Sequence, residues 1–462
     1  MPVPTRTPPT VITDLPSDLQ LETPGFGTNQ NSMDQPFPTI TDDNSKLLFR
    51  TEGQSVVPGG FFGDEALVMR DRTTGTNTLV ASSKDRDDSY FPKTAHFLPN
   101  GNVVFPEHGY WLPLAPDEPY INSFFDVFQT QIYEWDAETH DYTVLSLGLD
   151  GKPIASVPFG VHPQPGDLAP THGPRNPEVS ADGRYVFFTT AVRVDPAETQ
   201  SPLTDYKDLF RRDTVTGEIV QVNVGNYDEF GINANRARSG VEKYEVSADG
   251  QYVMFITHAT GGLAETGHCG QAELVFLRDI DAETTALVSH DNLGKQRFTG
   301  PGYVPVTGSY PGTMSADGRY VIWQTMDLGM PNLPAHTSVI WDRLTGQNDW
   351  ILPGANGTPT RDWLLSATAD MSKVLTFIAD EGPSANGLIP GDGDGDGEGV
   401  LFDRSANTVR KVSQLPDGTA IPSGTMLEAT LSPDGSRVFF VSPDALLPGD
   451  THPGRDLYSM AL

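Results

Sequence analysis

The sequence predicts an all-β fold, a single seven-bladed β-propeller of four-stranded antiparallel blades. One hairpin motif recurs seven times along the 462 residues, and a second hairpin follows most of its copies. The 46 Gly and 39 Pro residues suit many turns better than long helices. The repeat outweighs any local motif, because each unit can bury its apolar face only against its neighbours.

The first hairpin is clearest at residues 179–188, which read VSADGRYVFF. A short apolar strand leads into the turn, and a strand of β-branched and aromatic residues leads out. Asp suits this turn because its side chain bonds to nearby backbone, and Gly because it accepts a positive φ. The other copies lie at 40–49, 97–105, 246–255, 314–323, 367–376 and 431–440. The turn residues of the seven copies are Asn44, Gly101, Gly183, Gly250, Gly318, Met371 and Gly435.

The second hairpin is clearest at residues 209–222, around the turn Asp-Thr-Val-Thr-Gly. Its relatives lie at 68–75, 132–139, 276–283, 339–346 and 401–407. Two hairpins make a four-stranded antiparallel unit of about 65 residues, which is the size of one propeller blade with generous loops.

The two hairpins together resemble the PD40 repeat of TolB-type, WD40-like β-propellers. The resemblance rests on the Ser-x-Asp-Gly hairpin followed by the Asp-x-x-Thr-Gly hairpin, and it covers almost the whole chain. It implies the propeller fold. It leaves the function open, because such repeats occur in scaffolds, in the gating domains of prolyl peptidases and, more distantly, in propeller lyases.

The two ends of the chain are expected to meet. We divide the chain into an N-terminal extension, 1–38, and the propeller, 39–462. The last repeat has only three strands, so we expect residues 10–13 (TVIT) to supply the fourth strand and close the ring, with the rest of the extension as a covering loop. Closure would remove sheet edges that otherwise invite aggregation.

The net charge of −31 disfavours nucleic acids and anionic membranes as partners. No apolar run is long enough for a membrane helix, so we expect no membrane insertion, and we expect a monomer. The single cysteine, Cys269, excludes an internal disulfide. The first residues lack the pattern of a signal peptide. The protein is therefore expected in the cytoplasm, or in the periplasm or outside the cell if a leader was removed.

The longer loops are expected to share one face of the propeller. The Ser-x-Asp-Gly and Asp-x-x-Thr-Gly turns are short and lie at one end of the blades, because successive antiparallel strands alternate in direction. The longer connections therefore lie at the other end, and they hold most of the histidines. Binding sites concentrate on loops of a rigid scaffold, so this face is expected to bind a protein, peptide or glycan.

The first strand of each blade carries two informative columns. One residue before the Ser position stand Ile40, Phe97, Val179, Val246, Met314, Ala367 and Leu431, all apolar. Two residues before it stand Thr39, His96, Glu178, Glu245, Thr313, Ser366 and Thr430, all polar. Strand side chains alternate, so the apolar column should pack between blades and the polar column should face the axis.

His96, Glu178 and Glu245 should therefore lie side by side in blades 2 to 4. They could bind a metal or transfer protons, and the alternative is a polar, water-filled channel without chemistry. His162, His172 and Arg175 form a second candidate set in one long loop. As a catalytic set they offer a base and a cation, which a polysaccharide lyase needs to neutralise a uronate; as loop residues they need no explanation.

A calcium loop is predicted at residues 390–403, which read PGDGDGDGEGVLFD. Asp392, Asp394 and Asp396, with Asp403 at position 12, resemble an EF-hand loop, and Glu398 adds a fourth carboxylate within seven residues. Two features depart from that pattern: position 12 is normally Glu, and Asp403 occupies the place of a turn aspartate in other blades. A solvated acidic loop is the alternative. A weaker cation site is conceivable at Asp450 and Asp456 of the last blade, where a plain turn is the alternative.

Two function classes remain open at this stage. The first is a binding or scaffold propeller, stabilised by Ca²⁺, that presents its acidic loop face to a protein, peptide or glycan. The second is a propeller enzyme, a carbohydrate lyase or hydrolase that uses His, Glu and Arg side chains of the central funnel, the opening around the propeller axis. The sequence contains no nucleophile elbow and no phosphate loop, which favours binding.

Overall fold

The computed structural model is all-β, as predicted, with no α-helix in the residues that it describes. These residues are 6–27, 38–51, 56–58, 65–83, 94–108, 130–154, 174–191, 194, 208–225, 240–257, 274–290, 312–324, 336–378, 388–389, 397–421, 429–448, 450 and 455–462. Their contacts divide the chain into two compact units, Val80–Leu287 and the remainder, Met1–Leu79 with Val288–Leu462.

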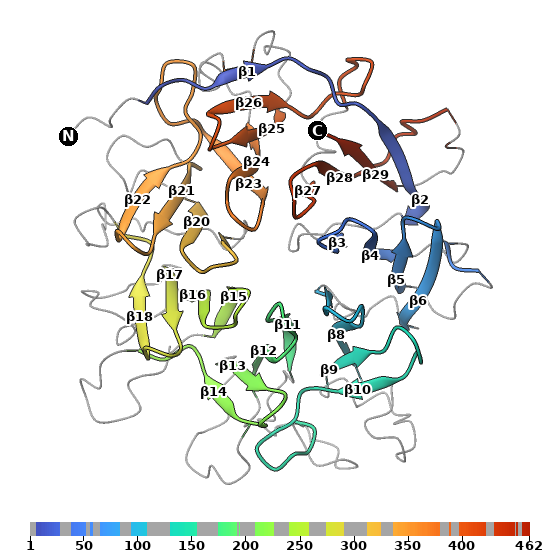
Figure 1. Cartoon of the computed structure of the whole chain (residues 1–462), viewed down its shortest axis with the longest axis vertical. Helices are drawn as coiled ribbons and strands as arrows, with labels where there is room; N and C mark the ends of the chain where they lie inside the picture. Colours follow the sequence, from blue (N-terminus) through green and yellow to red (C-terminus); the bar gives the residue numbers. More distant parts are fainter. Residues whose placement is uncertain are drawn as a thin grey trace, which may run out of the picture. The chain divides into compact units, whose positions relative to one another are not determined.

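The unit Val80–Leu287 contains three four-stranded antiparallel sheets, blades 2, 3 and 4. Each is a meander in which consecutive strands pair (Figure 1). Blade 2 consists of β7 (His96–Phe97), β8 (Val103–His108), β9 (Thr130–Trp135) and β10 (Tyr142–Val144). Blade 3 consists of β11 (Arg175–Val179), β12 (Tyr185–Thr190), β13 (Asp208–Asp213) and β14 (Ile219–Gln221). Blade 4 consists of β15 (Val241–Val246), β16 (Tyr252–Thr257), β17 (Leu274–Asp279) and β18 (Thr284–Leu287).

The other unit contains blades 5, 6, 7 and 1. Blade 5 consists of β19 (Thr313–Met314), β20 (Tyr320–Gln324), β21 (Ser338–Asp342) and β22 (Gln347–Trp350). Blade 6 consists of β23 (Asp362–Ala367), β24 (Lys373–Ile378), β25 (Glu398–Asp403) and β26 (Thr408–Lys411). Blade 7 starts with β27 (Thr430–Leu431), β28 (Arg437–Ser442) and β29 (Arg455–Ala461). Blade 1 consists of β3 (Thr39–Ile40), β4 (Lys46–Thr51), β5 (Glu65–Asp71) and β6 (Thr76–Ser83), the last of which spans the boundary between the units.

The turn of the first hairpin has the chemistry that its sequence predicts. In blade 3 the Ser180 hydroxyl donates to Asp182 (2.6 Å) and accepts from the backbone N–H of Tyr185 (2.9 Å). Ser247, Ser315 and Ser432 repeat the bond to their aspartates. All seven predicted turn residues have a positive φ, between 57° at Met371 and 87° at Gly101. The repeated Ser and Asp therefore hold a turn that Gly favours.

Apolar clusters between neighbouring blades form the core. One joins blades 3 and 4 through residues such as Phe187, Phe255 and Phe276, and another joins blades 5 and 6 through Ile340 and Leu364. Val246 and Ala367, members of the predicted apolar column, pack against these clusters. The four-stranded sheets and their packing confirm the predicted fold class, a seven-bladed β-propeller.

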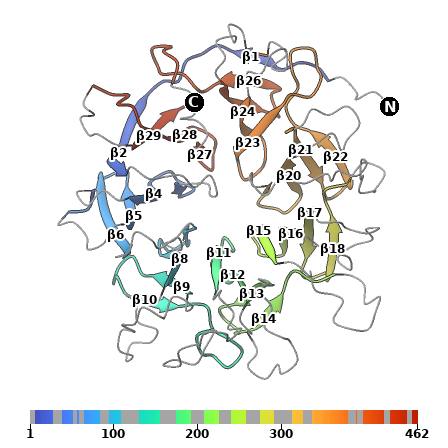
Figure 2. The same ribbon diagram turned by 180° about the vertical axis from the view of Figure 1, so that it is seen from behind.

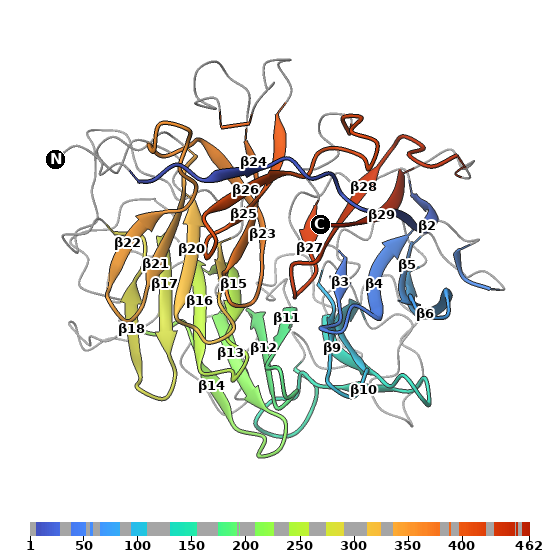
Figure 3. The ribbon, with the colours of Figure 1, turned by 45° about the horizontal axis from the view of Figure 1, so that its top comes forward.

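The strand that completes blade 7 is not the one expected. Residues 10–13 were predicted to fill that place, but β1 (Thr10–Ile12) pairs in parallel with β26 and is the fifth strand of blade 6. The fourth strand of blade 7 is β2 (Leu19–Gly27), which pairs antiparallel with β29 (Figure 3). The reason is the side-chain pattern, since Leu19 and Leu21 pack on the blade 7 core. An N-terminal strand does close this blade, as predicted.

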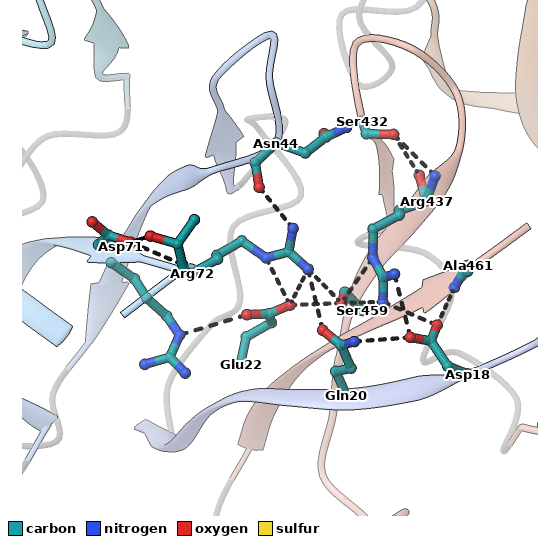
Figure 4. Close-up of polar contacts among 12 residues, drawn as sticks. Asp18, Gln20, Glu22, Asn44, Asp71, Arg72, Ser432, Arg437, Ser459 and Ala461 are labelled. Carbon is teal, nitrogen blue, oxygen red and sulfur yellow. Dashed lines mark hydrogen bonds and ion pairs between the residues drawn. The ribbon is translucent and has the colours of Figure 1, made fainter. Parts of the chain in front are cut away.

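A polar network fixes β2 between blades 7 and 1 (Figure 4). The buried Glu22 carboxylate accepts from the Ser459 hydroxyl (2.6 Å) and from Arg72 Nε (3.0 Å). Asp18 accepts from Arg437 Nη2 (3.2 Å) and from the backbone N–H of Ala461 (3.0 Å). Acidic side chains of the N-terminal segment thus bind arginines from near both ends of the remaining chain.

Candidate functional site

The polar column of blades 2 to 4 is the strongest candidate site in the described residues. It lies on the first strands of these blades, and β11 lies beside both β7 and β15. Figure 2 shows β11 between β8 and β15. His96 stands on β7, Glu178 on β11 and Glu245 on β15. The column holds in the other unit too, where the hydroxyls of Ser366 and Thr430 are 3.2 Å apart on the first strands of blades 6 and 7.

His96 and Glu178 form a close pair. His96 Nε2 lies 3.5 Å from Glu178 Oε2. The side chains are 25% and 21% exposed, so each is partly open to solvent although most of its surface is covered. The Nε2 atom itself is buried and has no hydrogen-bond partner among the residues that the structure describes.

Burial shifts the pKa values of the pair in opposite directions. Burial lowers the pKa of His96 to about 4, although a hydrogen bond to the carbonyl of Pro177 works against this shift. Burial raises the pKa of Glu178 to about 8. Both shifts favour the uncharged form, because a charge loses hydration when it is buried. At neutral pH the pair is therefore a neutral imidazole facing a protonated carboxyl group.

The backbone around Glu178 is irregular. The register of β11 against β12 shifts between Arg175 and Glu178, and Asn176 has a φ of +49°. Asn tolerates this left-handed conformation better than most residues do. The buried hydroxyl of Tyr244, on β15, donates a hydrogen bond to the carbonyl of Asn176. A β-bulge of this kind can redirect a side chain, and here it directly precedes Glu178.

Tyr244 is the residue that the sequence did not single out. Burial and, to a smaller extent, the charge of Glu178 raise the pKa of Tyr244 well above its usual value, so the hydroxyl keeps its proton and remains a donor. A signal was present in the sequence. Three residues before the Ser position the other blades have Pro38, Ala95, Pro177, Gly312, Leu365 and Ala429, and Tyr244 is the single aromatic residue of that column.

The remaining predicted residues are placed only in part. Glu245 is half-buried, and its backbone pairs with Met254 of β16. It stands on β15, the first strand of the blade that follows the blade of Glu178. The backbone of Arg175 pairs with Thr189 at the start of β11, and its side chain lies outside the described residues. His162 and His172 lie outside the described residues as well. The structure therefore brings together His96 and Glu178, on adjacent first strands.

Two of the five predicted calcium ligands, Glu398 and Asp403, are described, and both carboxylates have protein partners. Glu398 is buried, lies 2.5 Å from Lys411 Nζ and accepts a hydrogen bond from Ser413. Asp403 accepts from the Ser405 hydroxyl (2.7 Å) and the Ala406 N–H (2.9 Å), which is the role of a turn aspartate. Asp392, Asp394 and Asp396 lie outside the described residues. The calcium site remains a prediction, and it depends mainly on these three aspartates.

Asp450 and Asp456, considered for a weaker cation site, are both buried. Asp450 accepts a hydrogen bond from Tyr458, and Asp456 pairs in register with Ser442. Across the described residues, no three His, Cys, Asp or Glu side chains gather closely enough to hold a metal ion. The same residues include no helix with the length and apolarity that a membrane crossing requires.

No protein-family model matches this chain, and no curated protein matches it by sequence. Solved structures do match. The chain is similar to an oligogalacturonate lyase from Vibrio parahaemolyticus, with a TM-score of 0.51, 12% identity and coverage of 99% of this chain and 97% of that one. It matches TolB from Acinetobacter baumannii with a TM-score of 0.37, 13% identity and coverage of 80% and 63%. A β-propeller domain of a protease from Pyrococcus furiosus matches with a TM-score of 0.40, 10% identity and coverage of 76% and 78%.

At these identities the comparisons establish the fold and nothing finer. The similarity to the lyase extends over nearly the full length of both chains, which agrees with the seven sheets described above. The chain is a seven-bladed β-propeller with β-propeller neighbours, TolB and oligogalacturonate lyase among them.

Proposed function

We propose that this protein binds an uncharged, hydroxyl-rich ligand, a glycan segment, at the first strands of blades 2 to 4. The observation that carries the proposal is the His96–Glu178 pair, in which a buried Nε2 without a hydrogen-bond partner lies 3.5 Å from the carboxyl group. A neutral imidazole and a protonated carboxyl group each offer a donor and an acceptor. Sugar hydroxyls also donate and accept, and they bring no charge into the site.

Charge supports a neutral ligand over an anionic one. The chain carries a net charge of −31, which repels polyanions at a distance. A charged ligand would also change the protonation of Glu178 on binding, whereas a neutral glycan would leave it as it is. Pre-positioned polar groups in a partly buried site cost little reorganisation on binding.

Calcium belongs to the same proposal as a stabilising ion. Asp392, Asp394 and Asp396 would supply carboxylate oxygens, which are the ligands that Ca²⁺ prefers. The partners of Glu398 and Asp403 make those two residues secondary in this proposal.

A second candidate function, a carbohydrate hydrolase or lyase, is favoured by the pKa values of the pair. A carboxyl group whose pKa burial raises to about 8 is protonated at neutral pH and can act as a general acid. A neighbouring imidazole whose pKa is lowered to about 4 is free to accept a proton. The structural neighbour that acts on oligogalacturonate places carbohydrate chemistry on this fold, and it leaves the activity of this chain to experiment.

The binding proposal is tested with a panel of neutral and acidic glycans, followed by calorimetry on any that bind. We expect a neutral glycan to bind wild type and to bind Glu178→Ala and His96→Ala at least tenfold more weakly. Glu218→Ala is the matched control, because Glu218 is an exposed carboxylate in a turn of blade 3. Equal affinity in wild type and Glu178→Ala would place any binding elsewhere.

Turnover separates the two candidates. Glycans that bind are incubated with the protein, and the products are followed by chromatography and by absorbance of unsaturated sugars. If the protein is an enzyme, Glu178→Gln should lower kcat at least a hundredfold without lowering the melting temperature. If wild type binds a glycan without turning it over, binding is the one of the two candidate functions that the result supports.

A further inference from the structure

A buried polar cluster lies at one end of the apolar core between blades 5 and 6. It consists of Gln324, the last residue of β20, Ser338, the first residue of β21, and Asp362, the first residue of β23. Their exposed fractions are 2%, 0% and 0%. All three belong to the same compact unit.

Backbone geometry brings the three side chains together. Gln324 and Ser338 are direct cross-strand partners, so their side chains leave the sheet on the same side. Asp362 Oδ1 accepts from the backbone N–H of Ser338 (3.1 Å), and Gln324 Nε2 donates to the backbone carbonyl of Asp362 (2.5 Å). These bonds fix the cluster and use only one polar atom of each side chain involved.

Three oxygens of the cluster are left over. Asp362 Oδ2, Gln324 Oε1 and Ser338 Oγ are buried and have no hydrogen-bond partner within the described part of the chain. The connection that follows β24, residues 379–397, contains no Lys, Arg or His in its sequence. The connection that follows β20, residues 325–337, contains one such residue, His336, whose backbone carbonyl accepts from the backbone N–H of Asp362 (2.8 Å). A buried carboxylate oxygen without a partner is costly, so the arrangement calls for a ligand that interacts with oxygen atoms.

We propose that these three oxygens bind a hard cation, and that the ion is monovalent sodium. Carboxylate, amide and hydroxyl oxygens are ligands for hard cations, with water completing the coordination shell. The cluster contains one carboxylate, which balances one positive charge, whereas a divalent ion would leave a net charge in an apolar core.

The test compares melting temperatures of the full chain in sodium, potassium, magnesium and calcium chloride at one ionic strength. Tetramethylammonium chloride serves as the cation that is too large to enter. We expect sodium to raise the melting temperature of wild type in a saturable way. In ²³Na resonance measurements, binding to the protein should broaden the sodium signal relative to that of free sodium. In Asp362→Asn both effects should be lost. Asp42→Asn, which removes an exposed carboxylate of blade 1, should respond like wild type.

A second variant keeps the test decisive if Asp362→Asn does not fold. Gln324→Glu adds a carboxylate to the cluster, so the preferred ion should change from sodium to calcium. The experiment uses the Asp394→Asn, Asp396→Asn background, which removes the calcium response of the predicted loop. The proposal is overturned if sodium and tetramethylammonium give the same melting temperature in wild type, or if Gln324→Glu shows no new calcium response. The cluster would then hold a protonated carboxyl group.

Discussion

Gly250 illustrates how single residues hold the blades together. It is the turn residue of blade 4 and has a φ of +69°, a conformation that costs other residues energy. A Cβ added at this position would lie 2.8 Å from Cδ2 of Tyr185, in blade 3. Gly346 has a φ of +65° in a different turn, and a Cβ there would meet nothing within 4 Å. The two glycines separate the backbone requirement from the packing requirement.

We expect Gly346→Ala to lower the free energy of unfolding by about 1 kcal/mol, from backbone strain alone. Gly250→Ala should lower it by about 2–4 kcal/mol, because Tyr185 must also move. Urea denaturation followed by tryptophan fluorescence measures both changes. Equal losses in the two variants would show that the contact with Tyr185 contributes nothing.

The pH dependence of stability tests the protonation of Glu178. Burial raises the pKa of Glu178 to about 8 in the folded state, whereas its ordinary pKa is 4.5. Between these values the folded state keeps a proton that the unfolded state has released. The free energy of unfolding therefore falls as the pH rises to 8. His96, with its pKa lowered to about 4, has the opposite effect between pH 4 and 6.5. The two effects offset one another below pH 6.5, and above that only Glu178 acts.

Wild type should therefore lose about 2 kcal/mol of stability between pH 6.5 and 8, relative to Glu178→Gln. The difference between the two proteins cancels the titration of other groups. Denaturation curves at four pH values across this window give the slope. Parallel curves for the two proteins would mean that Glu178 is ionised in the folded state at neutral pH.

At the scale of elements, β2 stands out because it joins opposite ends of the sequence. Its residues pair with β29, from Leu19 opposite Met460 to Gly27 opposite Arg455. Glu22 binds Arg72 of blade 1 at 2.9 Å and Ser459 of blade 7 at 2.6 Å (Figure 4). β1, in contrast, is three residues long and adds only an outer strand to blade 6.

Truncation distinguishes the two N-terminal strands. Removing residues 1–14 deletes β1, and we expect a protein that stays soluble and melts within a few degrees of the full chain. Removing residues 1–27 also deletes β2, leaves β29 as an open edge and should cause aggregation. Light scattering during a thermal ramp measures both. If the shorter truncation aggregates as readily as the longer one, β1 is the closing strand in practice.

The carboxylate of Glu22 can be tested without removing the strand. Glu22→Gln leaves Arg72 and Arg70 without their buried anion, so the free energy of unfolding should fall by about 2–3 kcal/mol. Glu218→Gln, at an exposed turn position, should change it by less than about 0.5 kcal/mol. Matching losses in these two variants would show that the network adds nothing to stability.

At the scale of the whole molecule, the excess of negative charge is the dominant property. The chain has 61 Asp and Glu against 30 Lys and Arg. Self-repulsion of this kind destabilises a compact state and is reduced by salt and by bound cations. Asp392, Asp394 and Asp396 concentrate it in one loop, where a divalent ion would relieve it most.

Chelator should therefore lower the melting temperature, and Ca²⁺ should restore it better than Mg²⁺, which gives up its water less readily. Binding to the folded form alone would add about 2.7 kcal/mol at a hundredfold excess over the Kd. Asp394→Asn with Asp396→Asn should remove this response, while Asp362→Asn should retain it. Calorimetry that detects no heat of binding at millimolar Ca²⁺ would disprove the loop site.

The local geometry of the blades can be predicted from the amino-acid pattern alone. The Ser, Asp and Gly of the first hairpin bond within a few residues of one another, so all seven turn positions could be identified, including the non-glycine Asn44 and Met371. The alternation of side chains along a strand likewise predicted the polar column that brings His96 next to Glu178. These features depend on short-range bonds and on strand periodicity, which a sequence records directly.

The contacts between residues far apart in the chain became known from the three-dimensional structure. The closing strand is β2 and not residues 10–13, because Leu19 and Leu21 pack on the core of blade 7. These contacts join parts of the chain that are more than four hundred residues apart; Asp18 and Arg437, for example, are separated by 419 positions. The structure also joins Tyr244 to Asn176, and Gln324 and Ser338 to Asp362. The protonation of Glu178 likewise depends on the folded structure, because burial sets the pKa of a carboxyl group and burial exists only once the blades have packed.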